Sequence, residues 1–147
     1  RAALAAALDD DAELHAELSL PRSTPEAALA ACRRHLAERQ RTLEAGVSVL
    51  RDRLRAALAA RGGDWARLAA VDQVLAEALG RRERVLLATM PSLLSRRQLA
   101  LAAGMQAADA LCADLRQLLR AELDLRLQPV QGLLAALDGP STGTPAP

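Results

Sequence analysis

The chain has 147 residues, a length typical of one domain with a sizeable buried core. Its residues are 51% hydrophobic but include a single aromatic ring, that of Trp65, so Leu and Ala must fill most of the core. The 19 basic and 18 acidic residues leave a net charge of +1, which argues against a chain built mainly to bind nucleic acid. Ala and Leu are strong helix formers, and typical strand residues are scarce. Composition therefore predicts an all-α protein.

The first predicted element is a helix over residues 1–20. Its leucines follow a helical spacing: Leu4, Leu8, Leu14 and Leu18. Pro21 and Pro25 interrupt this pattern, because proline lacks the backbone donor that a helix interior needs. The chain begins at Arg1 rather than Met, which leaves open a truncated region before this helix.

A long second helix is predicted from Pro25 to the glycines at 62 and 63. Thr24 suits the N-cap, Pro25 suits the first helical position, and Glu26 favours the positive end of the helix dipole. At 1.5 Å per residue the helix would be about 55 Å long, which suits an elongated bundle. One apolar stripe runs along it, at Leu29, Cys32, Leu36, Leu43, Val47, Leu50, Leu54 and Leu58.

A third helix is predicted to fold back antiparallel on the second after the two-glycine turn. We expect Asp64 to cap this helix and Pro91 to stop it. Its apolar positions are Leu68, Val71, Val74, Leu75, Leu79, Val85 and Leu86. A shorter helix with Leu93, Leu94 and Leu101 then leads to Gly104.

The last long helix carries leucines strictly at intervals of four: Leu111, Leu115, Leu119, Leu123 and Leu127. Residues 122–127 also alternate charged and apolar side chains, as an exposed strand does, but Leu, Glu and Arg are poor strand formers and we predict helix. Pro129 is expected to end or kink the helix, with two more turns following.

These elements predict an all-α fold, an elongated antiparallel helical bundle or helical hairpin with coiled-coil character. The domains are an N-terminal helix over residues 1–20, a helical bundle over residues 24–137, and a tail over residues 138–147. The tail is predicted to be disordered, because its Pro, Gly, Ser and Thr residues offer too little apolar surface to fold.

No set of residues predicts an active site. Cys32 and His35 lie one helical turn apart, but a closed zinc site needs four ligands, and Cys112 and His15 are the remaining residues of these types. No pattern fixes a cysteine nucleophile against a histidine base, and Gly62–Gly63 lacks the Lys-Ser/Thr of a phosphate loop. We therefore expect no catalytic residue, no cofactor, no metal and no enzymatic activity.

The cysteines and the apolar pattern indicate a location. Two widely spaced cysteines do not form a disulfide framework. The sequence has no recognisable signal peptide and no run of about 18 apolar residues. We expect a cytoplasmic protein without direct membrane insertion.

Arginine clusters provide an alternative function, binding of nucleic acid. Along the second helix, basic and acidic residues alternate as on a solvated, ion-paired face, and no aromatic platform is present for bases. The residues that would carry the alternative are Arg81, Arg82, Arg84, Arg96 and Arg97.

Three segments resemble an uncharacterised proteobacterial family, a domain of unknown function. They are residues 119–137 (LRAELDLRLQPVQGLLAAL), residues 53–75 (RLRAALAARGGDWARLAAVDQVL) and residues 86–94 (LLATMPSLL). The resemblance covers roughly residues 26–137. It implies a gene beside membrane proteins related to the flagellar stator and to OmpA/MotB, as in loci similar to the type III Zorya anti-phage defence system. It brings no catalytic motif.

The leading functional hypothesis is a non-enzymatic adaptor or effector component of a multi-protein assembly. By the resemblance, its partners would include a stator-like complex of the inner membrane. Leu118 and Leu125 lie off the main stripe of the last helix, so we place the partner contact there, at Leu118, Glu122, Asp124, Leu125, Arg126 and Gln128. A structural homodimer formed through the long helices is a further alternative, compatible with the first.

Overall fold

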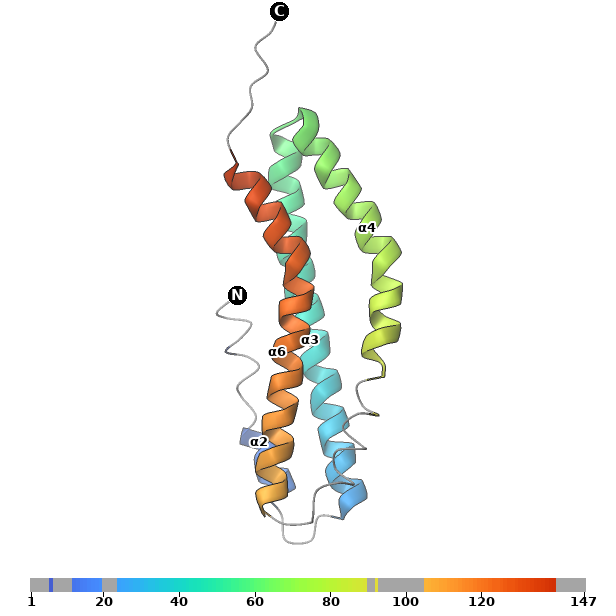
Figure 1. The fold of residues 1–147 in the computed structure, drawn as a ribbon, viewed down its shortest axis with the longest axis vertical. Coiled ribbons are helices and arrows are strands. Elements are labelled where there is room, and N and C mark those ends of the chain that lie inside the picture. Colours follow the sequence, from blue (N-terminus) through green and yellow to red (C-terminus); the bar gives the residue numbers. More distant parts are fainter. Residues whose placement is uncertain (1–5, 7–11, 20–23, 90–91, 93–104, 140–147) are drawn as a thin grey trace, which may run out of the picture.

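The computed structural model describes residues 6, 12–19, 24–89, 92 and 105–139. Its elements over these residues are helices: α2 (Ala12–Leu18), α3 (Pro25–Ala60), α4 (Gly63–Leu87) and α6 (Met105–Asp138). The two longest helices, α3 and α6, lie side by side along the long axis of the molecule, and α4 returns beside α3 (Figure 1). The predicted all-α, elongated bundle is confirmed.

The helix directions add a feature that the sequence did not predict. α3 and α4 form the predicted antiparallel hairpin, with Glu44 near Arg84 and Arg51 near Asp72. α3 and α6 run parallel, since Gln40 meets Glu122 and, further along both helices, Arg61 meets Leu137. The bundle thus joins one antiparallel and one parallel helix pair (Figure 1).

The helix ends follow the predicted chemistry at α3 and differ from it at α4. The Thr24 hydroxyl accepts a hydrogen bond from the Ala27 amide at 3.2 Å, which confirms the predicted N-cap. At α4 the N-cap is Gly62, and the predicted cap, Asp64, lies inside the first turn. Gly62 and Gly63 have φ values of 72° and 53°, which side chains disfavour, so the tight turn needs glycine and starts the helix early.

The core lies between α3 and α6, with Leu14 of α2 at one end. All five leucines of the last helix's four-residue repeat are buried, four of them in this core, and Leu119 is 0% exposed. They meet the stripe of α3, whose buried members are Cys32, Leu36, Leu43, Val47, Leu54 and Leu58. α6 stays helical over residues 122–127, so the helix interpretation of this segment is confirmed. The helix does not end at Pro129, which lies inside it.

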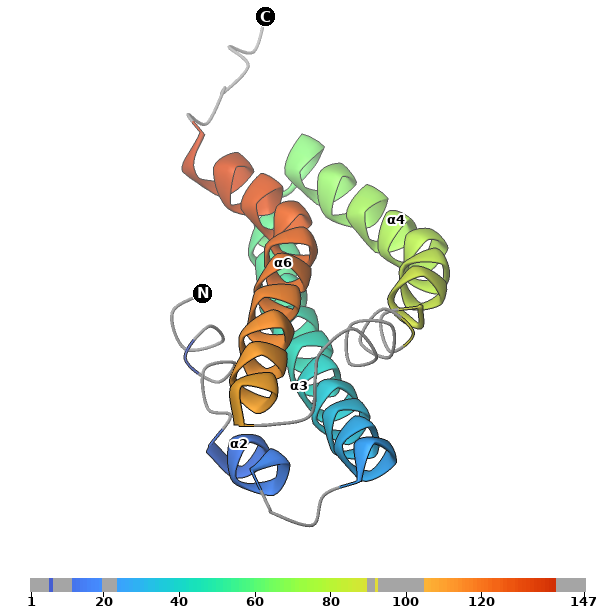
Figure 2. The same cartoon turned by 60° about the horizontal axis from the view of Figure 1, so that its bottom comes forward.

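α4 contributes little to this core. Its buried residues are Ala69, Asp72 and Leu87, while its other leucines and its valines remain exposed. α4 diverges from α3 and α6 along its length in both views (Figures 1 and 2). One long helix of the bundle is thus attached mainly through small and charged residues.

Each end of the bundle has a polar contact between two of its segments. At the α2 end, His15 Nε2 lies 2.7 Å from Asp109 Oδ1. At the other end, Arg61 donates to the Leu137 carbonyl at 2.7 Å, and its guanidinium carbon lies 5.8 Å from the centre of the Trp65 ring. The second contact ties the α3–α4 turn to the last turn of α6.

Parts of the predicted organisation fall outside the described residues. These are Leu4 and Leu8 of the first helix, the short helix around Leu93, and residues 140–147 of the tail. Within the described part, α2 covers Ala12–Leu18 of the predicted helix 1–20, and α6 ends at Asp138, where the tail was predicted to begin.

Candidate functional site

A groove of about 450 Å³ lies between α3, α4 and α6. We call it the α4–α6 groove. Its apolar lining comes from Leu79 and Leu86 of α4 and from Leu125 and Pro129 of α6, with Val47 of α3. Leu79, Leu86 and Leu125 are 57%, 61% and 51% exposed. The groove therefore offers large apolar side chains to an incoming molecule.

Arginines outnumber acidic residues in the lining of the groove, although most of these arginines pair with acidic residues in or beside it. Its lining includes two glutamates, Glu44 and Glu83, and five arginines, namely Arg51, Arg55, Arg82, Arg84 and Arg126. Arg84 Nη1 of α4 lies 3.7 Å from Glu44 Oε1 of α3, and both side chains are about half exposed or more. Such an exposed pair contributes little to stability, so its members can exchange partners at small cost.

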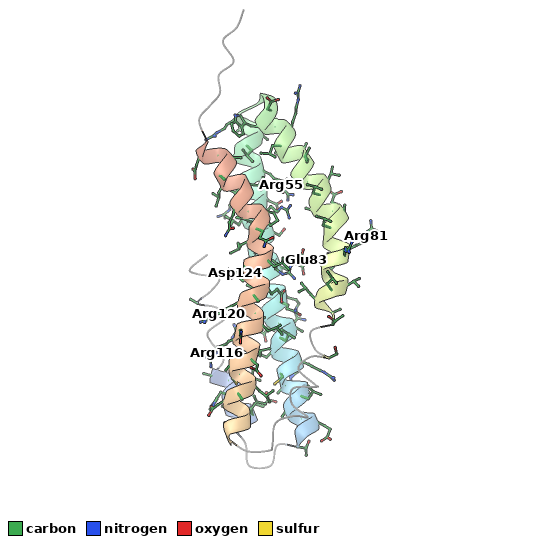
Figure 3. All side chains as sticks on the ribbon, in the orientation of Figure 1. Arg55, Arg81, Glu83, Arg116, Arg120 and Asp124 are labelled. Carbon is green, nitrogen blue, oxygen red and sulfur yellow. The ribbon has the colours of Figure 1, made fainter. Side chains whose placement is uncertain are left out.

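A buried polar network lies beneath the α6 wall of the groove. Glu122 is 1% exposed, accepts from Gln40 Nε2 at 2.9 Å and accepts from Arg126 Nε at 2.8 Å. Arg126 Nη1 also lies 3.3 Å from Glu83 Oε1 on α4. Figure 3 shows Glu83 on the side of α4 that faces the bundle. The network holds Arg126 in place as a bridge between α6 and α4.

A second network fixes α4 on α3. Arg51 donates two hydrogen bonds to Asp72, at 2.8 and 2.6 Å, and Arg55 adds a third at 3.3 Å. Arg55 also pairs with Asp52. Asp72 is 8% exposed, so this charged cluster is largely withdrawn from water. Buried ion pairs need such a full set of hydrogen bonds, because desolvation of each charge is costly.

The six residues predicted for the partner contact do not form one surface. Leu125, Arg126 and Gln128 line the α4–α6 groove. Leu118 packs partly buried against the core, and Glu122 is buried beneath the groove. Asp124 lies on the side of α6 away from α4, near Arg120 (Figure 3). The structure thus brings three of the six together and adds α4 residues to them.

The arginines of the nucleic-acid alternative are also divided. Arg82 and Arg84 line the groove. Arg81 projects outward from α4 and lines a second hollow with Gln73 and Glu77 (Figure 3). Arg96 and Arg97 lie outside the described residues.

The sequence did not predict the roles of Asp72, Gln40 and Glu83, because the partner of each lies on another helix. The sequence did contain two signals for Glu122. It lies one helical turn before Arg126, a spacing that allows an ion pair. It also follows Leu118 by four residues and Leu119 by three, which places it on the side of the helix that faces the core. No comparable signal existed for Asp72, whose partners are 21 and 17 residues away.

Cys32 and Cys112 are both buried in the core and are not joined in a disulfide. Burial raises the pKa of the Cys32 thiol above its ordinary value, and the negative charge of Glu17 adds to the rise. Over the described residues, no three His, Cys, Asp or Glu side chains gather as metal ligands do. No helix in that same part of the chain has the length and apolar character to cross a membrane.

The sequence profile of a family described as Protein of unknown function (DUF3348) matches residues 1–139. The chain belongs to this family. No curated protein and no solved structure matches the chain. The family relationship therefore agrees with the resemblance to a domain of unknown function and carries no activity with it.

Proposed function

We propose that this chain is a non-enzymatic protein–protein interaction component, an adaptor in a multi-protein assembly, and that the α4–α6 groove binds its partner. One observation carries the proposal: three large apolar side chains, Leu79, Leu86 and Leu125, stand exposed in a groove rimmed by arginines. Contiguous exposed apolar surface in a charged rim is typical of protein-binding sites.

The groove indicates the chemistry of the partner segment. Burial of apolar surface is worth roughly 25 cal/mol per Å², so leucine-sized side chains of the partner would provide most of the affinity. Arg82 and Arg84 at the rim favour acidic residues beside them, which would speed association and fix the register. We therefore infer an amphipathic partner segment with apolar anchors and flanking Asp or Glu.

The cellular setting of the proposal rests on the family resemblance. That resemblance implies a gene beside OmpA/MotB-related membrane proteins, as in loci similar to the type III Zorya system. We propose that the chain works in the cytoplasm with a stator-like inner-membrane complex in defence against phage. Plaque counts on a host carrying the whole locus test this setting: Leu125→Glu should abolish protection, and protection equal to wild type would contradict it.

A photo-crosslinking amino acid placed at position 125 tests the groove itself. A crosslinked partner should form from position 125 and not from position 134 on the same helix, where Leu134 is 41% exposed but outside the groove. Leu86→Glu on the facing helix should remove the crosslink, because both leucines line the groove.

The purified partner then gives the decisive comparison. Leu125→Glu should weaken its binding roughly tenfold or more, while Leu134→Glu leaves binding unchanged. Equal effects of the two substitutions, or a crosslink from position 134 alone, would place the contact elsewhere.

A further inference from the structure

The apolar surface of α4 extends beyond the α4–α6 groove. Leu68, Val71 and Leu75 are 37%, 54% and 48% exposed, and Ala78 is exposed beside them. None of these four lines the groove. The inward face of α4 is occupied by Ala69 and Asp72 against α3, so the outward face has no cover from the described part of the chain.

The outward residues follow a heptad pattern. One series recurs every seven residues at Leu68, Leu75 and Arg82. A second series, displaced by three residues, holds Asp64, Val71 and Ala78. Two such series are the a and d positions of a coiled-coil seam. The seam has an apolar centre, an acidic residue at one end and a basic residue at the other.

We propose that this seam, residues 64–82 of α4, binds a second copy of the same chain in antiparallel orientation. In this pairing Leu68 packs on Ala78 of the second copy, and Val71 packs on its Leu75. Asp64 then meets Arg82 of the second copy, and the same ion pair forms at the opposite end by symmetry. A two-fold axis near position 73 relates the copies, as a homodimer requires.

Charge complementarity selects this occupant and this orientation. A parallel dimer would stack Asp64 on Asp64 and Arg82 on Arg82 within the seam, whereas the antiparallel dimer converts both layers into ion pairs. Both side chains are available, since Asp64 is 92% exposed and Arg82 is exposed. Large residues also face small ones in the Leu68–Ala78 layers, which lets the helices approach closely.

One kind of like-charged contact, formed twice by symmetry, accompanies this arrangement. Arg67 approaches Arg81 of the second copy at the exposed rim, where salt screens charges effectively. Arg67 Nη1 already lies 3.1 Å from Asp64 Oδ1 of its own helix. The seam spans about 27 Å at 1.5 Å per residue, so the dimer is a modest one that depends on concentration.

Dimerisation goes beyond the adaptor role proposed above. The seam shares Arg82 with the rim of the groove, but it does not use Leu125, Arg126 or Gln128 of the α6 wall. Two grooves in one particle would bind a multimeric partner with a gain in avidity. The two proposals fail separately, because Leu125→Glu addresses the groove and Leu75→Glu addresses the seam.

Light scattering during size-exclusion chromatography, at several concentrations of the whole chain, tests the dimer. The wild type should pass from monomer to dimer as concentration rises. Leu75→Glu should weaken the dimer about a hundredfold, because the change enters the seam twice. Val49→Glu on α3 is the matched control, since Val49 is 51% exposed outside the seam, and it should dimerise as the wild type does.

A charge exchange tests the orientation without altering the apolar layers. Asp64→Arg and Arg82→Asp should each weaken the dimer roughly tenfold, and the double variant should recover most of this loss, since the ion pairs reform with reversed sign. Circular dichroism should give equal helix content for all variants, so a loss of dimer is not a loss of fold.

Thiol crosslinking adds an independent readout. Val74→Cys places two thiols near the two-fold axis, while Leu68→Cys places them about 15 Å apart along the seam. A short crosslinker should join the first pair and not the second. A wild-type chain that is monomeric at every concentration, a double variant no tighter than the single ones, or equal crosslinking from both positions would overturn the proposal. If the wild type is monomeric and Leu75→Glu abolishes its binding to a different protein, the seam binds that protein and not a second copy of the chain.

Discussion

α6 and α4 are both long, leucine-rich helices that lie against α3, yet they use their apolar residues in opposite ways. The repeat leucines of α6 are at most 4% exposed, whereas the large apolar residues of α4 from Leu68 to Leu86 are 37–69% exposed. The α3–α6 interface is held by apolar packing, and the α3–α4 interface by Arg51, Arg55 and Asp72. A helical apolar stripe therefore predicts a helix and a face, but not which neighbour covers that face.

The largest expected difference between the two helices is the cost of truncating a leucine. Leu119→Ala should lower the free energy of unfolding by about 3 kcal/mol, because it leaves a cavity in the α3–α6 core. Leu75→Ala on α4 should change it by less than about 0.5 kcal/mol. Urea denaturation at a concentration where the chain is monomeric measures both. Equal losses would mean that the α4 stripe is packed within the monomer.

A smaller loss is expected from the ion cluster that attaches α4. Asp72→Asn leaves the largely buried Arg51 guanidinium without a countercharge and leaves Arg55 with Asp52 alone, which should cost about 2 kcal/mol. Hydrogen exchange should increase along α4 more than along α6. Asp64→Asn is the control, since Asp64 pairs with Arg67 in open solvent and its change should have little effect. Uniform protection of α4 in Asp72→Asn would show that apolar contacts attach this helix.

The smallest expected effect is a pH dependence of the free energy of unfolding, caused by Cys32 in the α3–α6 core. Because burial raises the pKa of the Cys32 thiol above its ordinary value of 9.0, the unfolded chain loses this proton before the folded chain does. The contribution of this thiol to the free energy of unfolding is fully present below about pH 9 and is lost as the pH rises through the pKa of the folded state. The free energy of unfolding should fall less steeply above pH 9 in Cys32→Ala than in the wild type. Parallel slopes would argue against this source.

Much of the bundle could be predicted from local pattern. Thr24 and Pro25 give the start of α3, the two glycines give the turn, and the four-residue leucine repeat gives the buried face of α6. Each of these signals acts within one or two helical turns. They are therefore readable without knowledge of the tertiary structure.

The parallel course of α3 and α6 and the candidate groove needed the structure. The ion pair between Asp72 and Arg51 determines which face of α4 lies inward. Arg51 lies 21 residues before Asp72, so no local sequence pattern predicts this pair. Glu122 was predicted to lie in the partner contact because it is close in sequence to Leu118 and Leu125, whereas Gln40 and Arg126 satisfy it inside the bundle. Half of the predicted contact residues line the groove. They were predicted because Leu125 lies off the buried stripe of the last helix.

The contact of Arg61 with Trp65 and with the Leu137 carbonyl gives the protein an intrinsic optical probe. Trp65 is the sole indole of the chain, and it stands where the α3–α4 turn meets the final turn of α6. Its emission wavelength and quenching follow the position of the charged guanidinium beside it. Movement of α4 about the two-glycine turn, or fraying of the α6 terminus, can thus be followed in real time by fluorescence on the unlabelled wild-type chain.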